Sequence, residues 1–166
     1  TSTWSEVSLT LDDVFAKLCN LNANKSAGPD GFPPVLFKNC ASFLTFPLFL
    51  IFKSSLDNGC MPNKLKQAHI IPIHKSGSLN DVKNYRPIAK LSIIAKILDS
   101  LMADQLFTHF SHLISTNQHG FFKKRSTVTN LMAYTDRLQK CLEDGGQVDV
   151  IFTDFSKAFD KVNHQL

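Results

Sequence analysis

The feature that most constrains the fold is a long stretch of helical periodicity in the middle of the chain. Apolar residues recur at spacings of three and four from Ile93 to Ile114, and Ser92 stands at the capping position. A second helix is predicted after Ser126 or Thr127 and ends before the glycine pair 145–146. Its residues expected to face inward are Val128, Leu131, Met132, Leu138, Cys141 and Leu142.

The first third of the chain also predicts helices. Thr10 and Asp13 have capping-box spacing, so a helix is expected to begin at Leu11. The loop 22–31 contains Pro-Asp-Gly, a strong turn sequence. A further helix is predicted from the proline pair 33–34 to about residue 58, with a bend allowed at Pro47 and Gly59 as its end.

Two parts of the chain predict β-structure. Residues 68–73 and 85–88 flank a turn at 75–78, which indicates either a hairpin or a pair of strands. Residues 147–155 predict a strand buried in a sheet, because apolar residues occur on both of its faces. Helices together with antiparallel strands indicate an α+β fold.

The charges are segregated along the chain. The 18 basic and 14 acidic residues leave a net charge of +4. Residues 61–90 carry a net +5 and residues 121–135 a net +3, whereas residues 143–166 carry −3. This layout suits polyanion binding beside a metal site, although charge alone fits a solvated basic face equally well.

Several classes of protein are excluded. The four cysteines form no C-x-x-C pair, so a zinc site is not expected. The longest apolar run, residues 41–52, is too short to span a bilayer and contains a proline. The sequence starts at Thr1 without a charged and then apolar leader, so secretion is not expected.

Asp154 lies near the end of the last predicted strand. A carboxylate in apolar surroundings is costly without a partner, and at a strand end it is often a metal ligand. Taken alone, the residue fits two other roles better: a cap for a following helix, or a bond to a basic neighbour.

Four motifs occur in a fixed order and together resemble a known family. Residues 152–164, FTDFSKAFDKVNH, resemble motif A of the reverse transcriptases of non-LTR (LINE-type) retrotransposons, jockey-like elements in particular. Upstream, residues 25–31 resemble the opening loop of that family, with Ala27 where proline is usual. Residues 74–77 and 84–88 resemble its fingers motif, and residues 118–121 and 125–127 resemble the next motif. The resemblance extends from about residue 9 to residue 166.

The resemblance implies an architecture: right-hand polymerase fingers and the first strand of an antiparallel palm sheet, in a helix-rich α+β fold. Residues 1–31 would then form a lead-in helix and the opening loop. Residues 32–146 would form the fingers, and residues 147–166 the truncated start of the palm.

The resemblance also implies site residues. Asp154 matches the first catalytic, metal-binding aspartate, and Phe155 would offer its backbone carbonyl to Mg²⁺ or Mn²⁺. Lys75 and Arg86 match residues that hold the nucleotide triphosphate. Phe159 matches the aromatic residue that excludes a 2′-hydroxyl group. Contact with the template is expected of Lys25, Gln118, Lys123, Lys124 and Arg125, although residues 122–124 depart from the family pattern.

The partners implied are an RNA template, a DNA primer, deoxynucleoside triphosphates and the element RNA in a ribonucleoprotein. Such a protein would be intracellular, in a cytoplasmic ribonucleoprotein and in the nucleus, with no membrane association. The family's downstream Asp-Asp turn is not present in this sequence. The only adjacent aspartates, Asp12 and Asp13, precede all the motifs and look like acids in the first turn of a helix. The chain alone is therefore expected to be inactive.

Three alternatives stay open from the sequence. Within the polymerases, the chain could come from a group II intron-type reverse transcriptase or from an RNA-dependent RNA polymerase. Phe159 argues against ribonucleotide use. Outside the enzymes, it could be a decayed or domesticated RNA-binding module without catalysis.

Overall fold

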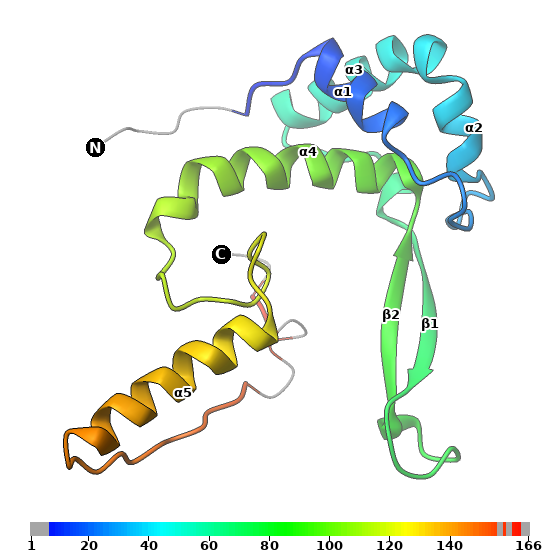
Figure 1. The fold of residues 1–166 in the computed structure, drawn as a ribbon. Helices are drawn as coiled ribbons and strands as arrows, with labels where there is room; N and C mark the ends of the chain where they lie inside the picture. The colour runs from blue at the N-terminus through cyan, green and yellow to red at the C-terminus, as the bar shows by residue number, and fades with distance from the viewer. Residues whose placement is uncertain (1–6, 156–157, 159–160, 164–166) are drawn as a thin grey trace. The chain divides into compact units, whose positions relative to one another are not determined.

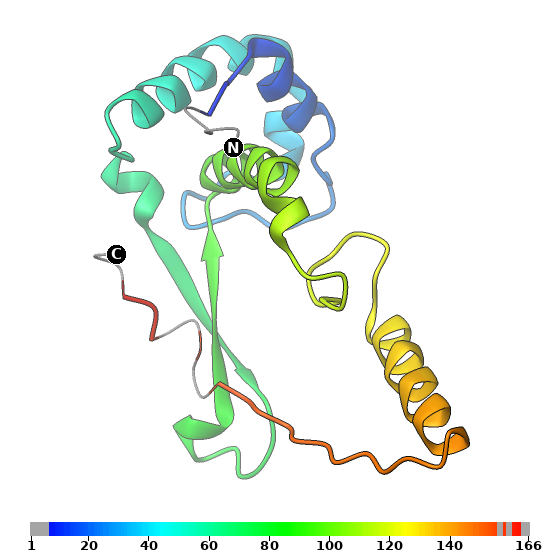
Figure 2. The same ribbon diagram turned by 90° about the vertical axis from the view of Figure 1, so that its left-hand side faces the viewer.

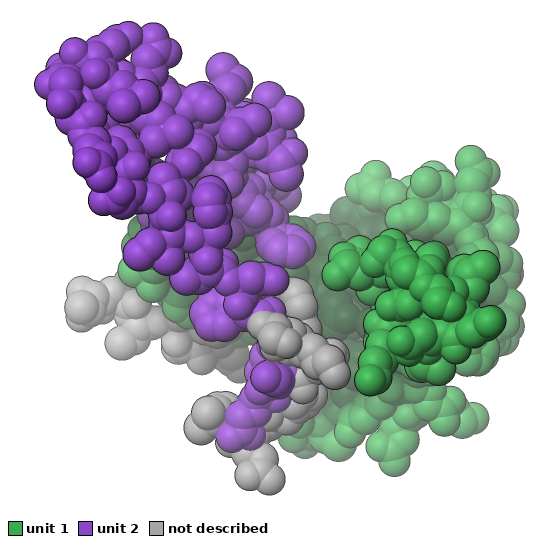
Figure 3. All heavy atoms as spheres, turned by 90° about the horizontal axis from the view of Figure 1, so that it is seen from below, with its two compact units in different colours: residues 1–113 green, residues 114–166 purple. Residues whose placement is uncertain are grey.

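The computed structural model describes residues 7–155, 158 and 161–163. The chain divides into two compact units, which are coloured separately in Figure 3: a first unit of residues 1–113 and a second unit of residues 114–166. The first unit contains α1 (Leu11–Cys19), α2 (Pro34–Asn39), α3 (Ala41–Asp57), β1 (Ala68–His74), β2 (Tyr85–Leu91) and α4 (Ile93–Phe110), with short 3-10 turns at Asn63–Lys66, Val82–Asn84 and Ser111–Leu113. The second contains α5 (Thr127–Glu143).

Helix α1 begins where its capping sequence predicts. The Thr10 side chain accepts a hydrogen bond from the Asp13 backbone N–H, and the Asp13 carboxylate accepts one from the Thr10 backbone N–H. These reciprocal bonds satisfy two backbone donors that would otherwise lack partners. Val14 and Leu18, one turn apart, are buried.

The single helix predicted from residue 33 to residue 58 is wrong, because the structure has two helices there. The break lies at Cys40, which ends α2 and precedes α3, and not at Pro47, which lies inside α3. A proline inside a helix removes one ladder hydrogen bond and crowds the preceding turn, but the burial of Leu48 and Phe52 beyond it stabilises the continued helix. Gly59, with φ +60°, follows the end of α3 as predicted.

One hydrophobic core joins the helices of the first unit. Helix α1 packs against α2, α3 and α4, and Figure 1 shows these helices gathered at one end of the unit. The buried core residues are Val14, Leu18, Phe37, Ala41, Leu48, Phe52, Ile93, Ile97, Leu98 and Leu101. These buried residues all come from α1, α2, α3 and α4, so this cluster is formed by the helices of the first unit.

The β-structure of the first unit is a hairpin. Strands β1 and β2 pair antiparallel, from Ala68 opposite Leu91 to His74 opposite Tyr85. The hairpin extends away from the helices in both ribbon views (Figures 1 and 2). Most of its residues are exposed, so packing against the helical core does little to hold its tip.

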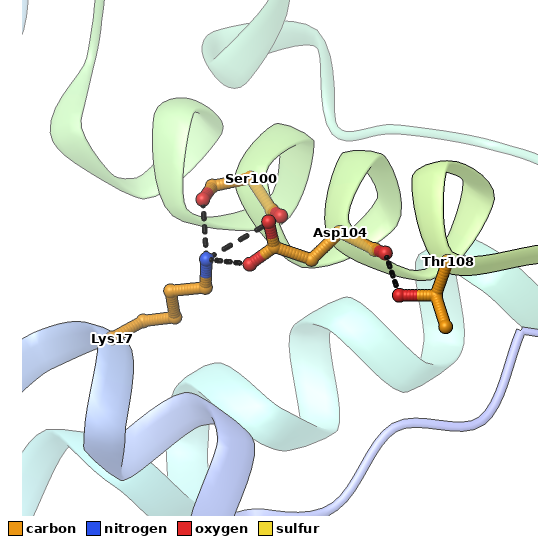
Figure 4. A network of polar contacts seen from close by, with 4 residues as sticks. All are labelled: Lys17, Ser100, Asp104 and Thr108. Carbon is orange, nitrogen blue, oxygen red and sulfur yellow. Dashed lines mark hydrogen bonds and ion pairs between the residues drawn. The ribbon is translucent and has the colours of Figure 1, made fainter. Parts of the chain in front are cut away.

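Helix α4 connects the hairpin to the core, as the long periodic stretch predicts. Ser92 caps it by accepting a hydrogen bond from the Ala95 backbone N–H. Lys17 of α1 reaches α4, where its ammonium group donates to the Ser100 hydroxyl and pairs with the Asp104 carboxylate, both at 2.5 Å (Figure 4). None of the helices in the described residues has both the length and the apolar character needed to cross a membrane.

Helix α5 forms as predicted, but its predicted burial is wrong. Ser126 caps it reciprocally with Thr129. No residue of α5 is buried among the described residues, and Leu131 is 60% exposed. The apolar periodicity is present, yet no described element of the second unit covers it.

The strand predicted at residues 147–155 is also wrong. These residues are described and belong to neither a helix nor a strand. A strand needs a hydrogen-bonded neighbour, and β1 and β2 form a two-stranded sheet with each other alone. The predicted α+β class is confirmed, because the described residues are rich in helix and contain an antiparallel hairpin.

Candidate functional site

The hairpin tip brings together the two residues predicted to hold a triphosphate. Arg86 lies on β2 opposite Ile73, and Lys75 follows the end of β1. Pairing continues one residue beyond the strands, since the Lys75 N–H donates to the Asn84 carbonyl at 2.7 Å. Because strand side chains alternate between faces, this register places Lys75 and Arg86 on the same face, one diagonal step apart. Both are exposed.

The tip is held by polar contacts of its own. The Tyr85 hydroxyl donates to the Leu79 carbonyl at 2.9 Å, and the Asn84 amide donates to the Ser78 carbonyl at 2.9 Å. The His74 and Tyr85 rings pack edge to face, 5.3 Å apart. Gly77 has φ +83°, a conformation that favours glycine, and a Cβ atom there would lie 2.7 Å from the Asn84 side chain. The tip is therefore an ordered turn that fixes the end of β1 and the start of β2.

Lys25 lies in the loop between α1 and α2, in the same unit as the hairpin. The loop turns as predicted, with Gly31 at φ +76° and its N–H bonded to the Gly28 carbonyl. Gly28 lies directly against the junction of β2 and α4: a Cβ atom there would lie 2.7 Å from the Leu91 carbonyl oxygen. The loop is thus fixed on α4, and Lys25 is exposed on it.

The remaining residues predicted to contact template lie in the second unit, in the loop before α5. Arg125 donates to the carbonyls of Thr116 and Gln118, at 2.7 and 2.5 Å, and its guanidinium lies 4.6 Å from the centre of the Phe122 ring. These bonds involve one of its terminal nitrogens. Arg125 therefore organises the loop, a role that the sequence did not indicate.

Gln118, Lys123 and Lys124 belong to this same loop. The Gln118 side chain donates to the Gly120 carbonyl at 3.2 Å, and Lys124 has φ +64°. Both lysines lie between the 3-10 turn after α4 and helix α5, and both are exposed. A cluster of cations at a helix start suits contact with phosphate, but the specific contacts stay a prediction.

Asp154 and Phe155 lie in the irregular segment after α5, and both are exposed. Phe159 lies outside the described residues. Within the described part of the chain, no three His, Cys, Asp or Glu side chains come close enough to hold a metal ion. The Asp154 carboxylate and the Phe155 carbonyl are oxygen donors of the kind that Mg²⁺ prefers, but two donors do not make an ion site by themselves.

The predicted residues therefore fall into two groups. Lys25, Lys75 and Arg86 belong to the first unit, and the others belong to the second. Sequence reasoning missed Lys17 and Lys96, which line a hollow together with Lys25. No motif could have indicated these two lysines, because only the packing of α1 on α4 brings them together.

Residues 73–166, more than half of the chain, match the family described as reverse transcriptase (RNA-dependent DNA polymerase). The chain belongs to the reverse transcriptase family. The match begins at the end of β1 and includes the hairpin tip, the loop before α5 and the Asp154 segment. Three of the four sequence motifs lie in these regions, whereas the opening loop at residues 25–31 precedes the matched segment.

Relatives of this reverse transcriptase segment are named as proteins of transposons. The chain is 31% identical to the RNA-directed DNA polymerase from mobile element jockey of Drosophila melanogaster, over 94% of the chain and 17% of the relative. It is 27% identical to the probable RNA-directed DNA polymerase from transposon BS of the same species, over 94% of the chain and 18% of the relative. It is 27% identical to the 149 kDa protein of transposon TX1 of Xenopus laevis, over 96% of the chain and 12% of the relative. The chain thus spans under a fifth of these relatives.

Proposed function

We propose that this chain is the first part of the polymerase domain of a non-LTR retrotransposon enzyme that copies RNA into DNA. The observation that carries the proposal is the match of residues 73–166 to the reverse transcriptase family, together with relatives named RNA-directed DNA polymerases. In this assignment residues 1–31 are the lead-in, residues 32–146 the fingers and residues 147–166 the start of the palm.

In the proposed reaction, Lys75 and Arg86 hold the triphosphate of the incoming nucleotide. Their shared face of the hairpin and their exposure support this role. A planar guanidinium group binds two phosphate oxygens at once, and an ammonium group adds a compact charge, so the pair can orient the leaving pyrophosphate. The ordered tip keeps both groups in place before the nucleotide arrives.

Asp154 is proposed as one ligand of a divalent cation, Mg²⁺ or Mn²⁺, with the Phe155 carbonyl beside it. When bound, such an ion activates the primer hydroxyl and neutralises charge on the phosphate. Because Asp154 and Phe155 supply too few donors alone, the remaining ligands must come from other carboxylates, phosphates and water. Phe159 is proposed as the residue that excludes a 2′-hydroxyl group.

The experiment is primer extension with the longer polymerase in which this segment lies, on an RNA template. We expect DNA synthesis that needs the RNA template and uses deoxynucleotides in preference to ribonucleotides. The 166-residue chain, assayed beside it, is expected to give no product. Ribonucleotide use equal to deoxynucleotide use would favour an RNA polymerase, and product from the short chain would contradict its proposed inactivity.

A further inference from the structure

Lysines gather around one hollow of the first unit. The hollow has a volume of about 500 Å³ and lies between α1, the loop that follows it, the start of α2 and α4. Its lining includes Lys17, Lys25 and Lys96, and among the described residues that line it there is no carboxylate. A concave site of this volume, lined by one sign of charge, attracts a small anionic group.

Two of these lysines are uncompensated. The Lys17 ammonium is neutralised by Asp104 and bonded to Ser100, as Figure 4 shows. Lys25 and Lys96 are both exposed, and neither ammonium has a hydrogen-bond or ion-pair partner in the described part of the chain. The hollow therefore keeps two positive charges for a ligand.

The loop that carries Lys25 is fixed at several points. The Lys90 ammonium donates to the Ser26 hydroxyl at 2.7 Å, and the Lys38 ammonium donates to the Leu21 carbonyl at 3.3 Å. Gly28 packs directly against the backbone at the start of α4. Anchoring the loop lowers the entropy that Lys25 loses on binding and adds two further cations near the hollow.

Part of the remaining lining is apolar. Pro34, Ile93 and Ile97 are buried side chains that line the same hollow. Lysine ammonium groups beside an apolar floor match a nucleotide unit, in which a charged phosphate is joined to a sugar and a base with less polar faces. Asn22, Ser26 and Ser100 add polar groups for the sugar hydroxyls.

We propose that this hollow binds one nucleotide unit of a single-stranded polynucleotide, with its phosphate between Lys25 and Lys96. The identification of that strand as the RNA template rests on the proposed function. The binding itself does not need catalysis, so it can be measured on the 166-residue chain.

The first test is lysine acetylation read by mass spectrometry, with and without a single-stranded RNA oligonucleotide. Bound phosphate shields ammonium groups. We therefore expect RNA to lower the acetylation rates of Lys25 and Lys96 to about one third or below, while the rate of Lys53 on α3 stays unchanged. Equal rates at Lys25 and Lys96 with and without bound RNA would overturn the site. The unmodified chain is used, so a folding defect cannot produce the result.

The second test compares the affinity of two double variants for the same RNA across salt concentrations. Lys25→Gln with Lys96→Gln should weaken binding by roughly three- to tenfold and lower the slope of log K against log salt by about 0.7, which is the contribution of the one phosphate held between the two lysines. Lys53→Gln with Lys140→Gln removes the same charge elsewhere and should leave the slope unchanged. Equal losses in both variants would overturn the site. Lys25→Arg with Lys96→Arg should restore binding.

A free nucleoside monophosphate distinguishes the source of the phosphate. If it protects Lys25 and Lys96 and the RNA does not, the hollow is a mononucleotide site and the strand proposal fails. If RNA protects these lysines but the longer polymerase makes no DNA, the hollow stands and the proposed function fails.

Discussion

Gly28 lies where the opening loop touches the first turn of α4, and its missing side chain is what permits the contact. A Cβ atom would lie 2.7 Å from both the Leu91 carbonyl oxygen and the Ser92 Cα atom, which are backbone atoms and cannot rotate away. The sequence alone marks Gly28 only as part of a turn. The structure shows that this residue lets the loop that carries Lys25 pack against the backbone at the start of α4.

Gly28→Ala should therefore destabilise the first unit. Forcing an extra methyl group into a packed contact typically costs about 1–3 kcal/mol, which urea denaturation followed by circular dichroism can measure. Gly120→Ala is the matched control: its nearest neighbour is a flexible Gln118 side chain at 3.3 Å, so the free energy of unfolding should change by about 0.5 kcal/mol or less. Equal stability of the two variants would contradict the close approach.

Arg86 is the residue at the hairpin tip whose substitution should affect nucleotide binding most. Arg86→Gln in the longer polymerase should lower kcat/KM for deoxynucleotides by tenfold or more, because a charge-assisted hydrogen bond contributes about 1.5–3 kcal/mol. Lys83→Gln removes a positive charge from the same tip without a proposed nucleotide contact. If both variants lose activity equally, the effect comes from the charge of the tip and not from Arg86.

Helices α4 and α5 have similar lengths, and both carry apolar residues at spacings of three and four, but α4 is the more apolar helix and their surroundings differ. In α4, Leu98 is 4% exposed and belongs to the core, whereas Leu131 in α5 is 60% exposed. Periodicity indicates which positions of a helix are apolar; it does not indicate whether an element is present to cover them. The helices could therefore be predicted, whereas the exposure of α5 could not.

This difference predicts unequal costs for one substitution. Leu98→Ala should lower the free energy of unfolding by about 2–5 kcal/mol, because it removes buried methyl groups and leaves a cavity. Leu131→Ala should change it by about 0.5 kcal/mol or less. Urea denaturation of both variants measures the difference. A loss at Leu131 as large as that at Leu98 would mean that the apolar side of α5 is packed in solution.

At the scale of the whole molecule, local signals predicted more than non-local ones. The caps at Thr10, Ser92 and Ser126 are local, and each helix begins where its cap indicates. The strand at 147–155 failed because a strand depends on a partner that its own residues do not encode. The lysine hollow was missed because Lys17 and Lys96 are distant in sequence and meet only through packing.

The site itself could be predicted only in part. The order of the motifs indicated the reverse transcriptase family, and the comparison confirms it. The roles of Asp154, Phe159 and the loop before α5 stay predictions. The division of the chain between fingers and palm also stays a prediction. The boundary between the two compact units falls after residue 113, inside the segment assigned to the fingers.

Asp154 carries the central claim, because the proposed polymerase chemistry at this segment depends on its carboxylate. The most direct measurement is RNA-templated primer extension by the longer polymerase carrying Asp154→Asn, compared with Asp149→Asn. Both substitutions remove one exposed carboxylate from the same irregular segment. We expect Asp154→Asn to reduce DNA synthesis by at least about a hundredfold, as the loss of a catalytic electrostatic contact does, and Asp149→Asn to leave it near the unmodified rate. DNA synthesis by Asp154→Asn equal to that of Asp149→Asn would contradict the assignment.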